Sequence, residues 1–244
     1  MRLKEKFMIP KKIHYCWFGG ADIPKNLRKY INSWKKYCPD YEIKLWNESN
    51  FDVYSHPFIK AAYESKAWAF VSDYARLKII YDEGGIYLDT DVELLKSLDS
   101  LLFNKCYIGI EQNGKRCNTG LGFGAEKHNS VVRKMLDEYN NIVFDKKNLI
   151  NIECPKLNTN VIKSIGEFSL NDISFLPDVT VYPSKFMDPI STGRTKNLLC
   201  DETISIHHYS ASWTSGKDKL KRRIVELIGV QRYFKIKQIF GRTL

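Results

Sequence analysis

Apolar residues recur along the first part of the chain with strand and helix spacings. Residues 13–18 form an apolar, aromatic run that stops at Gly19 and Gly20, which predicts a buried first strand followed by a loop. Residues 24–37 carry apolar side chains at helical spacing, and residues 41–46 alternate as in a second strand. This order is typical of the first unit of an open α/β sheet.

The strongest helical pattern covers residues 61–81 and is followed by Gly84 and Gly85, which accept the positive φ of a helix end. The apolar residues after the glycines predict a short strand that leads into Asp89 and Asp91. Residues two apart on a strand point to the same face, so we expect the two carboxylates to project together. Such a pair can share one Mg²⁺ or Mn²⁺ ion, which prefers oxygen ligands and often bridges phosphates.

The second half of the chain is less regular. Its predicted elements are two strands, a helix and a late strand over residues 106–112, 119–124, 130–140 and 203–209. Asn113-Gly114 predicts a hairpin between the two strands, whereas residues 141–200 show no clear period. At 244 residues and 43% hydrophobic content, we expect one α/β catalytic domain over residues 1–216 and a basic amphipathic helical tail over residues 217–244.

The net charge of +10 is unevenly distributed. Residues 71–100 hold seven acidic and three basic residues, whereas the tail concentrates the positive charge. The acidic segment suits a cation. The basic tail leaves a nucleic-acid-binding protein as an alternative, but its basic residues are not interleaved with aromatic residues in a binding motif. We therefore expect no nucleic-acid partner.

The six cysteines are scattered, with no spacing typical of a metal site, and we expect reduced thiols. No apolar run approaches the length that spans a membrane, and no export signal is recognisable. These features predict a cytoplasmic protein. The basic tail either lies on an anionic membrane, as a peripheral contact on its inner face, or packs on the catalytic domain.

The chain resembles the family-32 glycosyltransferases, the group with a DXD sugar-binding region that includes outer-chain mannosyltransferases and bacterial capsule enzymes. Glucosylating cytotoxins are more distant relatives. Four pieces carry the resemblance in order, namely residues 9–20, 72–76, 84–91 and 206–213. It implies a GT-A fold, in which a Rossmann-like mixed sheet is flanked by helices. It also implies retaining transfer of a sugar from a nucleotide diphosphate to an acceptor hydroxyl.

The resemblance also implies roles for residues that bind the donor. By position, Trp17 would stack on the nucleotide base and Tyr87 would line the nucleotide pocket. Asp73 and Arg76 would hold hydroxyls of the donor sugar, with Arg76 close to the leaving phosphate. The remaining donor contacts that it implies are Asn118 near the sugar, and Ser212 and Trp213 over the diphosphate.

The metal contacts are likewise implied by the resemblance. Asp89 and Asp91 would hold Mn²⁺ or Mg²⁺, and Asp91 joins Asp73 and Arg76 as a predicted catalytic residue. A histidine of the late strand would add a ligand or a phosphate contact. We prefer His208, because a metal-binding histidine precedes an aromatic residue in this way in related transferases. Neighbours on a strand face opposite ways, so His207 is the alternative and only one of the two should reach the metal.

Less specific interpretations remain beside this one. Trp17 fits a core aromatic residue as well as a stacking residue. A catalytically silent nucleotide-sugar-binding domain would show the same fold, although both aspartates and the late histidines are present. The resemblance to capsule enzymes favours a bacterial surface-polysaccharide transferase, with a glycan or lipid-linked glycan as its acceptor.

Overall fold

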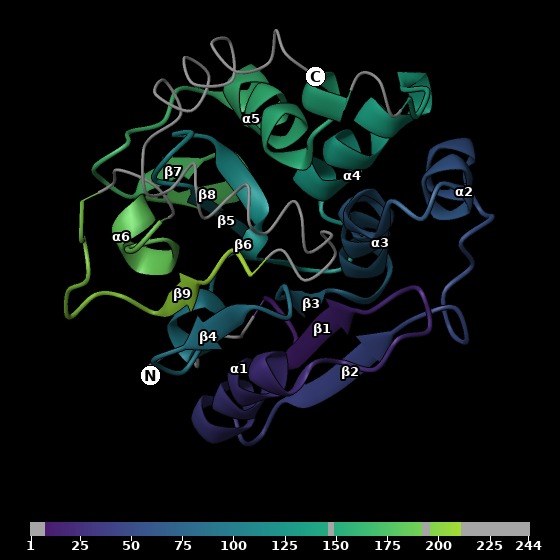
Figure 1. Ribbon diagram of the computed structural model, residues 1–244. Coiled ribbons are helices and arrows are strands. Elements are labelled where there is room, and N and C mark those ends of the chain that lie inside the picture. The colour runs from purple at the N-terminus through teal and green to yellow at the C-terminus, as the bar shows by residue number, and fades with distance from the viewer. Residues whose placement is uncertain (1–7, 146–148, 192–195, 211–244) are drawn as a thin grey trace, which may run out of the picture.

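A mixed seven-stranded sheet forms the centre of the protein (Figure 1). The computed structural model describes residues 8–145, 149–191 and 196–210. In sheet order, the strands are β2 (Glu42–Trp46), β1 (Lys12–Cys16), β3 (Gly85–Tyr87), β6 (Cys117–Ala125), β5 (Cys106–Ile110), β8 (Val179–Tyr182) and β7 (Ser174–Leu176). β1 runs parallel to β2 and β3, whereas β6 is antiparallel to both of its neighbours.

Helices cover both faces of this sheet. The α-helices are α1 (Lys25–Tyr37), α2 (Pro57–Glu64), α3 (Trp68–Glu83), α4 (Ser130–Asp137), α5 (Cys154–Ile165) and α6 (Ser184–Met187), with short 3₁₀ turns η1 (Asp99–Leu101), η2 (Glu138–Asn141) and η3 (Leu149–Asn151). In Figure 1, α3, α4 and α5 lie on one side of the sheet, and α1 lies on the other. The predicted mixed sheet flanked by helices is therefore confirmed.

Two apolar clusters hold the layers together. One cluster joins the sheet to α3, α4 and α5, and the other joins it to α1 and α6. Neighbouring strand residues alternate between the clusters: Ile86 faces one and Tyr87 the other, as do Tyr107 and Ile108. The central strands are therefore buried on both faces, which explains their continuous apolar character.

The predicted helix over residues 61–81 is two helices in the structure. α2 begins after His56, whose Nδ1 accepts a hydrogen bond from the Phe58 N–H at 3.2 Å. The chain then breaks at Lys66, which has a φ of 55°, and α3 starts afresh at Trp68. Apolar residues on both sides of this turn continue the helical spacing, so the pattern alone did not reveal the break.

The end of α3 follows the prediction. Gly84 has a φ of 67° and Gly85 a φ of 106°, values that favour glycine. A Cβ atom on Gly85 would lie 2.9 Å from both His14 Nε2 and the Lys12 carbonyl oxygen. The fully buried His14 fixes this turn: its Nε2 lies 3.0 Å from the Gly84 carbonyl oxygen, and its Nδ1 accepts from Trp46 Nε1 at 3.0 Å.

Asp89 and Asp91 do not lie on a strand as expected. β3 ends at Tyr87, and the two aspartates flank a turn in which the Val92 N–H donates to the Asp89 carbonyl oxygen at 3.0 Å. The chain then enters β4 (Val92–Leu94), which pairs antiparallel with the late strand β9 (Ser205–His207). This pairing sets Val92 opposite His207, and it brings the end of the described chain next to the aspartates.

Some predictions for the second half are confirmed. β5 and β6 pair as the expected hairpin, and the helix starting at Ser130 is present as α4 followed by η2. Residues 141–200, which showed no period, contain α5, β7, β8 and α6. Across the described ranges, no helix is long and apolar enough to cross a membrane. The predicted tail over residues 217–244 lies outside the described residues.

Candidate active site

A cavity of about 580 Å³ opens where β1, β6 and the Asp89–Asp91 turn meet the start of α3 and α5. Aromatic side chains form part of its wall, namely Trp17, Phe18, Trp68 and Phe70. The rest of the wall is strongly polar and includes Asp73, Arg76, Asp89, Asp91, Glu111, Arg116, Asn118, Glu153 and His207. A ligand with one flat apolar part and one polar, charged part would match this wall.

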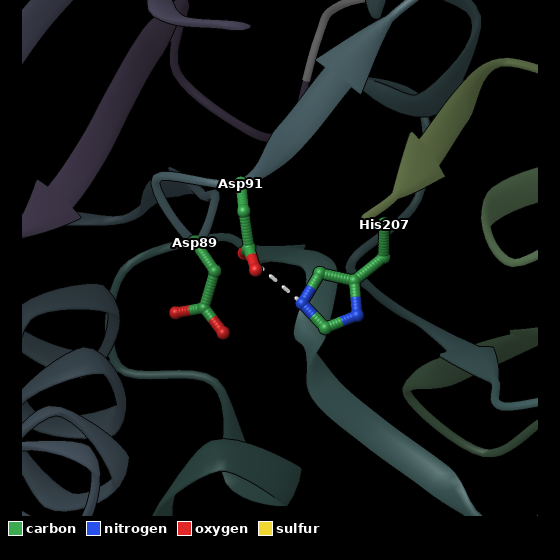
Figure 2. A group of neighbouring side chains, drawn as sticks. All are labelled: Asp89, Asp91 and His207. Atoms are coloured by element: carbon green, nitrogen blue, oxygen red, sulfur yellow. Dashed lines mark ion pairs between the residues drawn. The ribbon is translucent and has the colours of Figure 1, made fainter. Parts of the chain in front are cut away.

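Asp89, Asp91 and His207 form a group of potential metal ligands in the described part of the chain. One ligand atom from each lies within 4.8 Å of the others. Figure 2 shows Asp91 between Asp89 and His207, with a ring nitrogen of His207 facing Asp91. The distance from His207 Nε2 to Asp91 Oδ1 is 3.1 Å. The pairing of β9 with β4 produces this group, because it places His207 beside the turn that carries the aspartates.

The groups around Asp91 set the charge of its carboxylate. Burial raises the pKa of Asp91, but His207 and the Ser210 N–H, which donates to Asp91 Oδ2 at 2.7 Å, lower that pKa to about 2. The carboxylate is therefore ionised. Burial raises the pKa of the neighbouring Asp89, the Arg76 charge lowers it, and the negative charge of Asp91 raises it further. Two carboxylates and one imidazole fit a Mn²⁺ or Mg²⁺ ion, and such an ion would relieve their repulsion.

Arg76 links the metal-ligand group to α3. Its Nη2 donates to Asp89 Oδ1 at 3.0 Å and lies 3.2 Å from Asp73 Oδ1. Its Nε donates to the Ser72 carbonyl oxygen at 3.2 Å, and only 4% of the residue is exposed. Burial lowers the pKa of Arg76, but Asp89 and Asp73 raise it well above its usual value. The guanidinium therefore stays charged inside the site.

The carboxyl group of Asp73, unlike the Arg76 guanidinium, has a pKa shifted towards its neutral form. Burial raises the pKa of Asp73 to about 6, although the Arg76 charge opposes this shift. Its carboxyl group lines the cavity beside Arg76. The sequence prediction placed both residues in the site, and the structure brings them together there. An exposed i,i+3 ion pair, the simplest alternative for this spacing, does not fit such buried side chains.

Tyr87 does not line the cavity as expected, because its side chain is only 1% exposed. The ring lies beneath the Arg76 guanidinium at 4.9 Å, and its hydroxyl donates to Asp89 Oδ1 at 3.0 Å. β3 points this residue into the apolar cluster next to α3. Tyr87 therefore positions Arg76 and Asp89 from the apolar core, without lining the cavity itself.

The preference for His208 over His207 does not fit the geometry. His208 Nε2 lies 2.8 Å from Glu93 Oε2, and its ring stacks on Tyr30 at 4.3 Å, away from the cavity. His207 faces the aspartates instead. Neighbouring strand residues face opposite ways, and the register of β9 against β4, which the sequence did not reveal, decides which one faces inward.

Trp17 and Asn118, which the resemblance implies as donor contacts, both line the cavity. Trp17 Nε1 donates to the Ala21 carbonyl oxygen at 2.6 Å, which holds the loop after β1. Asn118 is 8% exposed, and its Oδ1 accepts from the Gly120 N–H at 2.8 Å. Ser212 and Trp213, the other predicted donor contacts, lie outside the described residues.

Sequence reasoning missed a network of charged side chains in the cavity wall. Arg116 Nε donates to Glu111 Oε1 at 2.8 Å, and Arg116 Nη1 donates to Glu153 Oε1 at 3.1 Å. Asn118 Nδ2 donates to Glu111 Oε2 at 3.0 Å. Glu111 and Arg116 flank the predicted hairpin turn, which was the available signal. Glu153 precedes α5, a helix that the sequence pattern did not predict.

Comparison with known proteins agrees with this geometry. Residues 24–108 match the family described as glycosyltransferase sugar-binding region containing DXD motif. An uncharacterised glycosyltransferase of Acanthamoeba polyphaga mimivirus is 26% identical over 231 residues, covering 84% of each chain. Inositol phosphoceramide mannosyltransferase 3 of Schizosaccharomyces pombe is 32% identical over 123 residues, which are 47% of this chain and 33% of the yeast protein.

A solved structure shows the same fold. The PaToxG glycosyltransferase superposes with a TM-score of 0.53 and 23% sequence identity, over 64% of this chain and 69% of that protein. The predicted GT-A fold is therefore confirmed. The match over residues 24–108 contains two of the four sequence pieces, residues 72–76 and 84–91, and agrees with the resemblance to the DXD glycosyltransferases.

Proposed function

We propose that the protein is a metal-dependent, retaining glycosyltransferase that moves a sugar from a nucleotide-diphosphate sugar to an acceptor hydroxyl. One observation carries the proposal: Asp89, Asp91 and His207 converge beside a cavity that also contains Arg76 and a tryptophan. A nucleotide sugar has a flat base, a diphosphate and a polyhydroxyl ring. Each part matches one portion of the cavity wall.

Asp89, Asp91 and His207 would hold the divalent ion. When bound, Mn²⁺ or Mg²⁺ neutralises the charge of the diphosphate. Asp91 is ionised and fixed by the Ser210 N–H, so it presents an oriented oxygen. Asp89 is fixed by hydrogen bonds from Arg76 and Tyr87. The ligand oxygens are therefore positioned before any ion or substrate binds.

Arg76 is the proposed electrostatic partner of the leaving phosphate. It is buried, charged and held by two carboxylates, so it needs little reorganisation to donate a charge-assisted hydrogen bond. Asp73, beside it, would accept hydrogen bonds from hydroxyls of the donor sugar, and Asn118 would contact the same sugar. Trp17 would stack on the base, with Ser212 and Trp213 covering the diphosphate.

The proposed reaction retains the anomeric configuration. The bond between the anomeric carbon and the phosphate oxygen breaks as the acceptor oxygen bonds to the same face of that carbon, through an oxocarbenium-like state. The departing phosphate oxygen accepts the proton of the acceptor hydroxyl. Each of the five carboxylates in the described wall is paired with a basic group, which supports same-face attack without a covalent intermediate. Arg76 engages Asp73 and Asp89, Arg116 engages Glu111 and Glu153, and His207 engages Asp91.

The proposed setting is bacterial surface-polysaccharide synthesis, with a glycan or lipid-linked glycan as the acceptor and no nucleic-acid partner. The motif resemblance to capsule enzymes supports it. Residues 1–216 would form the catalytic domain, and the tail over residues 217–244 would make a peripheral contact with an anionic membrane. A cytoplasmic enzyme at the inner membrane face would then meet a lipid-linked acceptor where that acceptor resides.

A screen of nucleotide sugars tests the proposal. Hydrolysis or transfer should occur with Mn²⁺ or Mg²⁺ and stop with a chelator, and early product analysis by NMR should show the retained anomer. Asp91→Asn should abolish turnover, whereas Asp178→Asn, at an exposed ion pair with Lys105, should not. Turnover that persists with chelator, or an inverted product, would contradict the metal or the stereochemical part respectively.

A further inference from the structure

Asp188 is a fully buried carboxylate that the proposed reaction does not use. It lies directly after α6, with 0% of the residue exposed. Burial raises its pKa, as expected for a charge removed from water. A buried carboxylate is unfavourable unless it has partners. Asp188 does not line the cavity, so the groups that it contacts must account for its burial.

Both identified partners of the Asp188 side chain lead towards the candidate active site. Its Oδ2 accepts from the Gln112 N–H at 2.7 Å and from the Tyr209 hydroxyl at 2.8 Å. Gln112 directly follows Glu111, which lines the cavity, and Tyr209 lines the cavity itself. Asp188 thus ties the end of β5 to the segment after β9.

Tyr209 is held in an unusual conformation against the metal-ligand histidine. Its φ is 47°, a left-handed value that is unfavourable for a residue with a side chain. Its ring meets the His207 ring edge-on, with centroids 4.1 Å apart. This turn also brings the next residue, Ser210, to donate its N–H to Asp91 Oδ2. The Asp188–Tyr209 hydrogen bond thus holds a strained turn that supports both His207 and Asp91.

In the described part of the chain, Asp188 and His207 each also have one buried atom without a hydrogen-bond partner. Among the described residues, buried Asp188 Oδ1 and buried His207 Nδ1 have no hydrogen-bond partner. One is an acceptor, and the other is a donor whenever Nε2 faces the metal ligands. The Tyr209 ring contacts the His207 ring, and its hydroxyl donates to Asp188, so the Asp188 charge lies one side chain away from the His207 ring. Histidines that bind metals usually have an acceptor near the second nitrogen, which fixes the tautomer and the ring orientation.

We propose that Asp188 is a positioning residue for the metal site, which acts on His207 through the Tyr209 hydroxyl and through its own negative charge. This inference rests on the proposed function, since it requires that Asp89, Asp91 and His207 hold a divalent ion. Asp188 itself does not contact the ion or the sugar. It keeps the His207 ring directed at Asp91 and keeps the 207–210 segment around that carboxylate.

Binding of Mn²⁺ to the full-length protein tests this role without any turnover. The free Mn²⁺ signal in electron paramagnetic resonance gives the Kd of the protein for the metal alone. Tyr209→Phe keeps the ring but removes the hydroxyl, and we expect it to raise the Kd about 10-fold. Asp188→Asn keeps an oxygen that can accept both hydrogen bonds but removes the charge, so its Kd should lie between those of wild type and Asp188→Ala.

Tyr182→Phe is the matched control. It removes a buried tyrosine hydroxyl that accepts from Asn104 Nδ2 at 3.3 Å, and the residue belongs to the apolar cluster against which Tyr209 packs. Its Tm should fall about as much as that of Tyr209→Phe, while its Mn²⁺ Kd should stay at the wild-type value. This comparison separates a role at the metal from a general loss of stability.

The outcomes distinguish the two proposals. If wild type binds Mn²⁺ and both Tyr209→Phe and Asp188→Asn bind it within twofold of wild type, the positioning role is overturned and the proposed function stands. If Tyr182→Phe weakens Mn²⁺ binding as much as Tyr209→Phe, the effect is general and the role is likewise overturned. If wild type does not bind Mn²⁺, the metal site of the proposed function fails, and this inference fails with it.

Discussion

The two sides of the metal-ligand group are built in different ways. On one side, Asp73, Arg76 and Asp89 come from one short stretch of chain and hold one another by direct ion pairs. On the other side, His207 comes from the far end of the described chain and reaches Asp91 only because β9 pairs with β4. The first side is local in sequence, and the second depends on the fold.

The metal-ligand residues on the two sides are therefore held in place by different interactions. On the local side, the acidic and basic side chains neutralise one another, so removing one of them should leave an unpaired buried charge and lower the free energy of unfolding. The distant side depends on how one short strand is placed and on the turn at Tyr209 that follows it. A change there should alter ligand geometry more than stability.

The largest effect is expected for Arg76→Met. This change leaves Asp73 and Asp89 as neighbouring buried carboxylates without their cation, which should lower the free energy of unfolding by about 3–5 kcal/mol. Urea denaturation in a chelating buffer measures it. Lys78→Met, on the same helix, breaks an exposed i,i+4 pair with Asp82 and should cost less than about 1 kcal/mol. Similar losses of unfolding free energy in both variants would contradict the conclusion that the ion pairs of Arg76 are buried and essential to the local side.

The second effect concerns His14, which holds the turn between α3 and β3 that precedes the aspartates. Burial lowers the pKa of His14 to about 4, from its usual 6.5, against a smaller opposing effect of the Gly84 carbonyl. A histidine whose folded pKa is lowered contributes its full stability above pH 6.5, and that stability is lost as pH falls towards 4. The free energy of unfolding should therefore drop by about 2 kcal/mol between pH 7 and pH 5 from this group.

His14→Gln provides the comparison for this pH dependence. The variant is less stable at pH 7, because the hydrogen bonds to Gly84 and Trp46 are altered. Between pH 7 and pH 5, however, its stability should fall less steeply than that of wild type in urea titrations. Parallel pH curves for the two proteins would show that His14 is not held neutral by the fold.

The third effect separates the aromatic wall from the core. Trp17→Ala should weaken binding of a nucleoside diphosphate by about 1–3 kcal/mol, the scale of stacking between a base and an aromatic side chain. Trp34→Ala, at a fully buried tryptophan of α1, should instead lower the free energy of unfolding by about 3–5 kcal/mol. Calorimetry and urea denaturation on both variants measure these values. Unchanged nucleotide affinity in Trp17→Ala would make that residue part of the structure only.

The local side was largely predictable from the sequence. The glycine stop, the apolar strand and the Asp-Thr-Asp sequence are contiguous, and Asp73 and Arg76 share one helix. Even here one inference was wrong: the aspartates lie at a turn, which gathers their carboxylates without the twofold alternation of a strand. The break at Lys66 was also missed, because helical spacing continues across it.

The distant side was predictable only in outline. The sequence indicated a late strand with two histidines, but a three-residue strand carries no pattern that fixes its register. The choice of His208 failed for this reason. Asp188 and Glu153 gave no signal, since they belong to the segment without periodicity. Their importance comes from tertiary contacts with Tyr209 and Arg116.

The most direct test of the metal site compares His207→Ala with His208→Ala. Both variants remove one imidazole from the same strand end, but only the first removes a proposed ligand. In electron paramagnetic resonance titrations with Mn²⁺ alone, His207→Ala should weaken Mn²⁺ binding at least about 10-fold, the loss expected when metal-site support is removed, while His208→Ala should bind as wild type does. Loss of binding in His208→Ala with retention in His207→Ala would contradict the site described here.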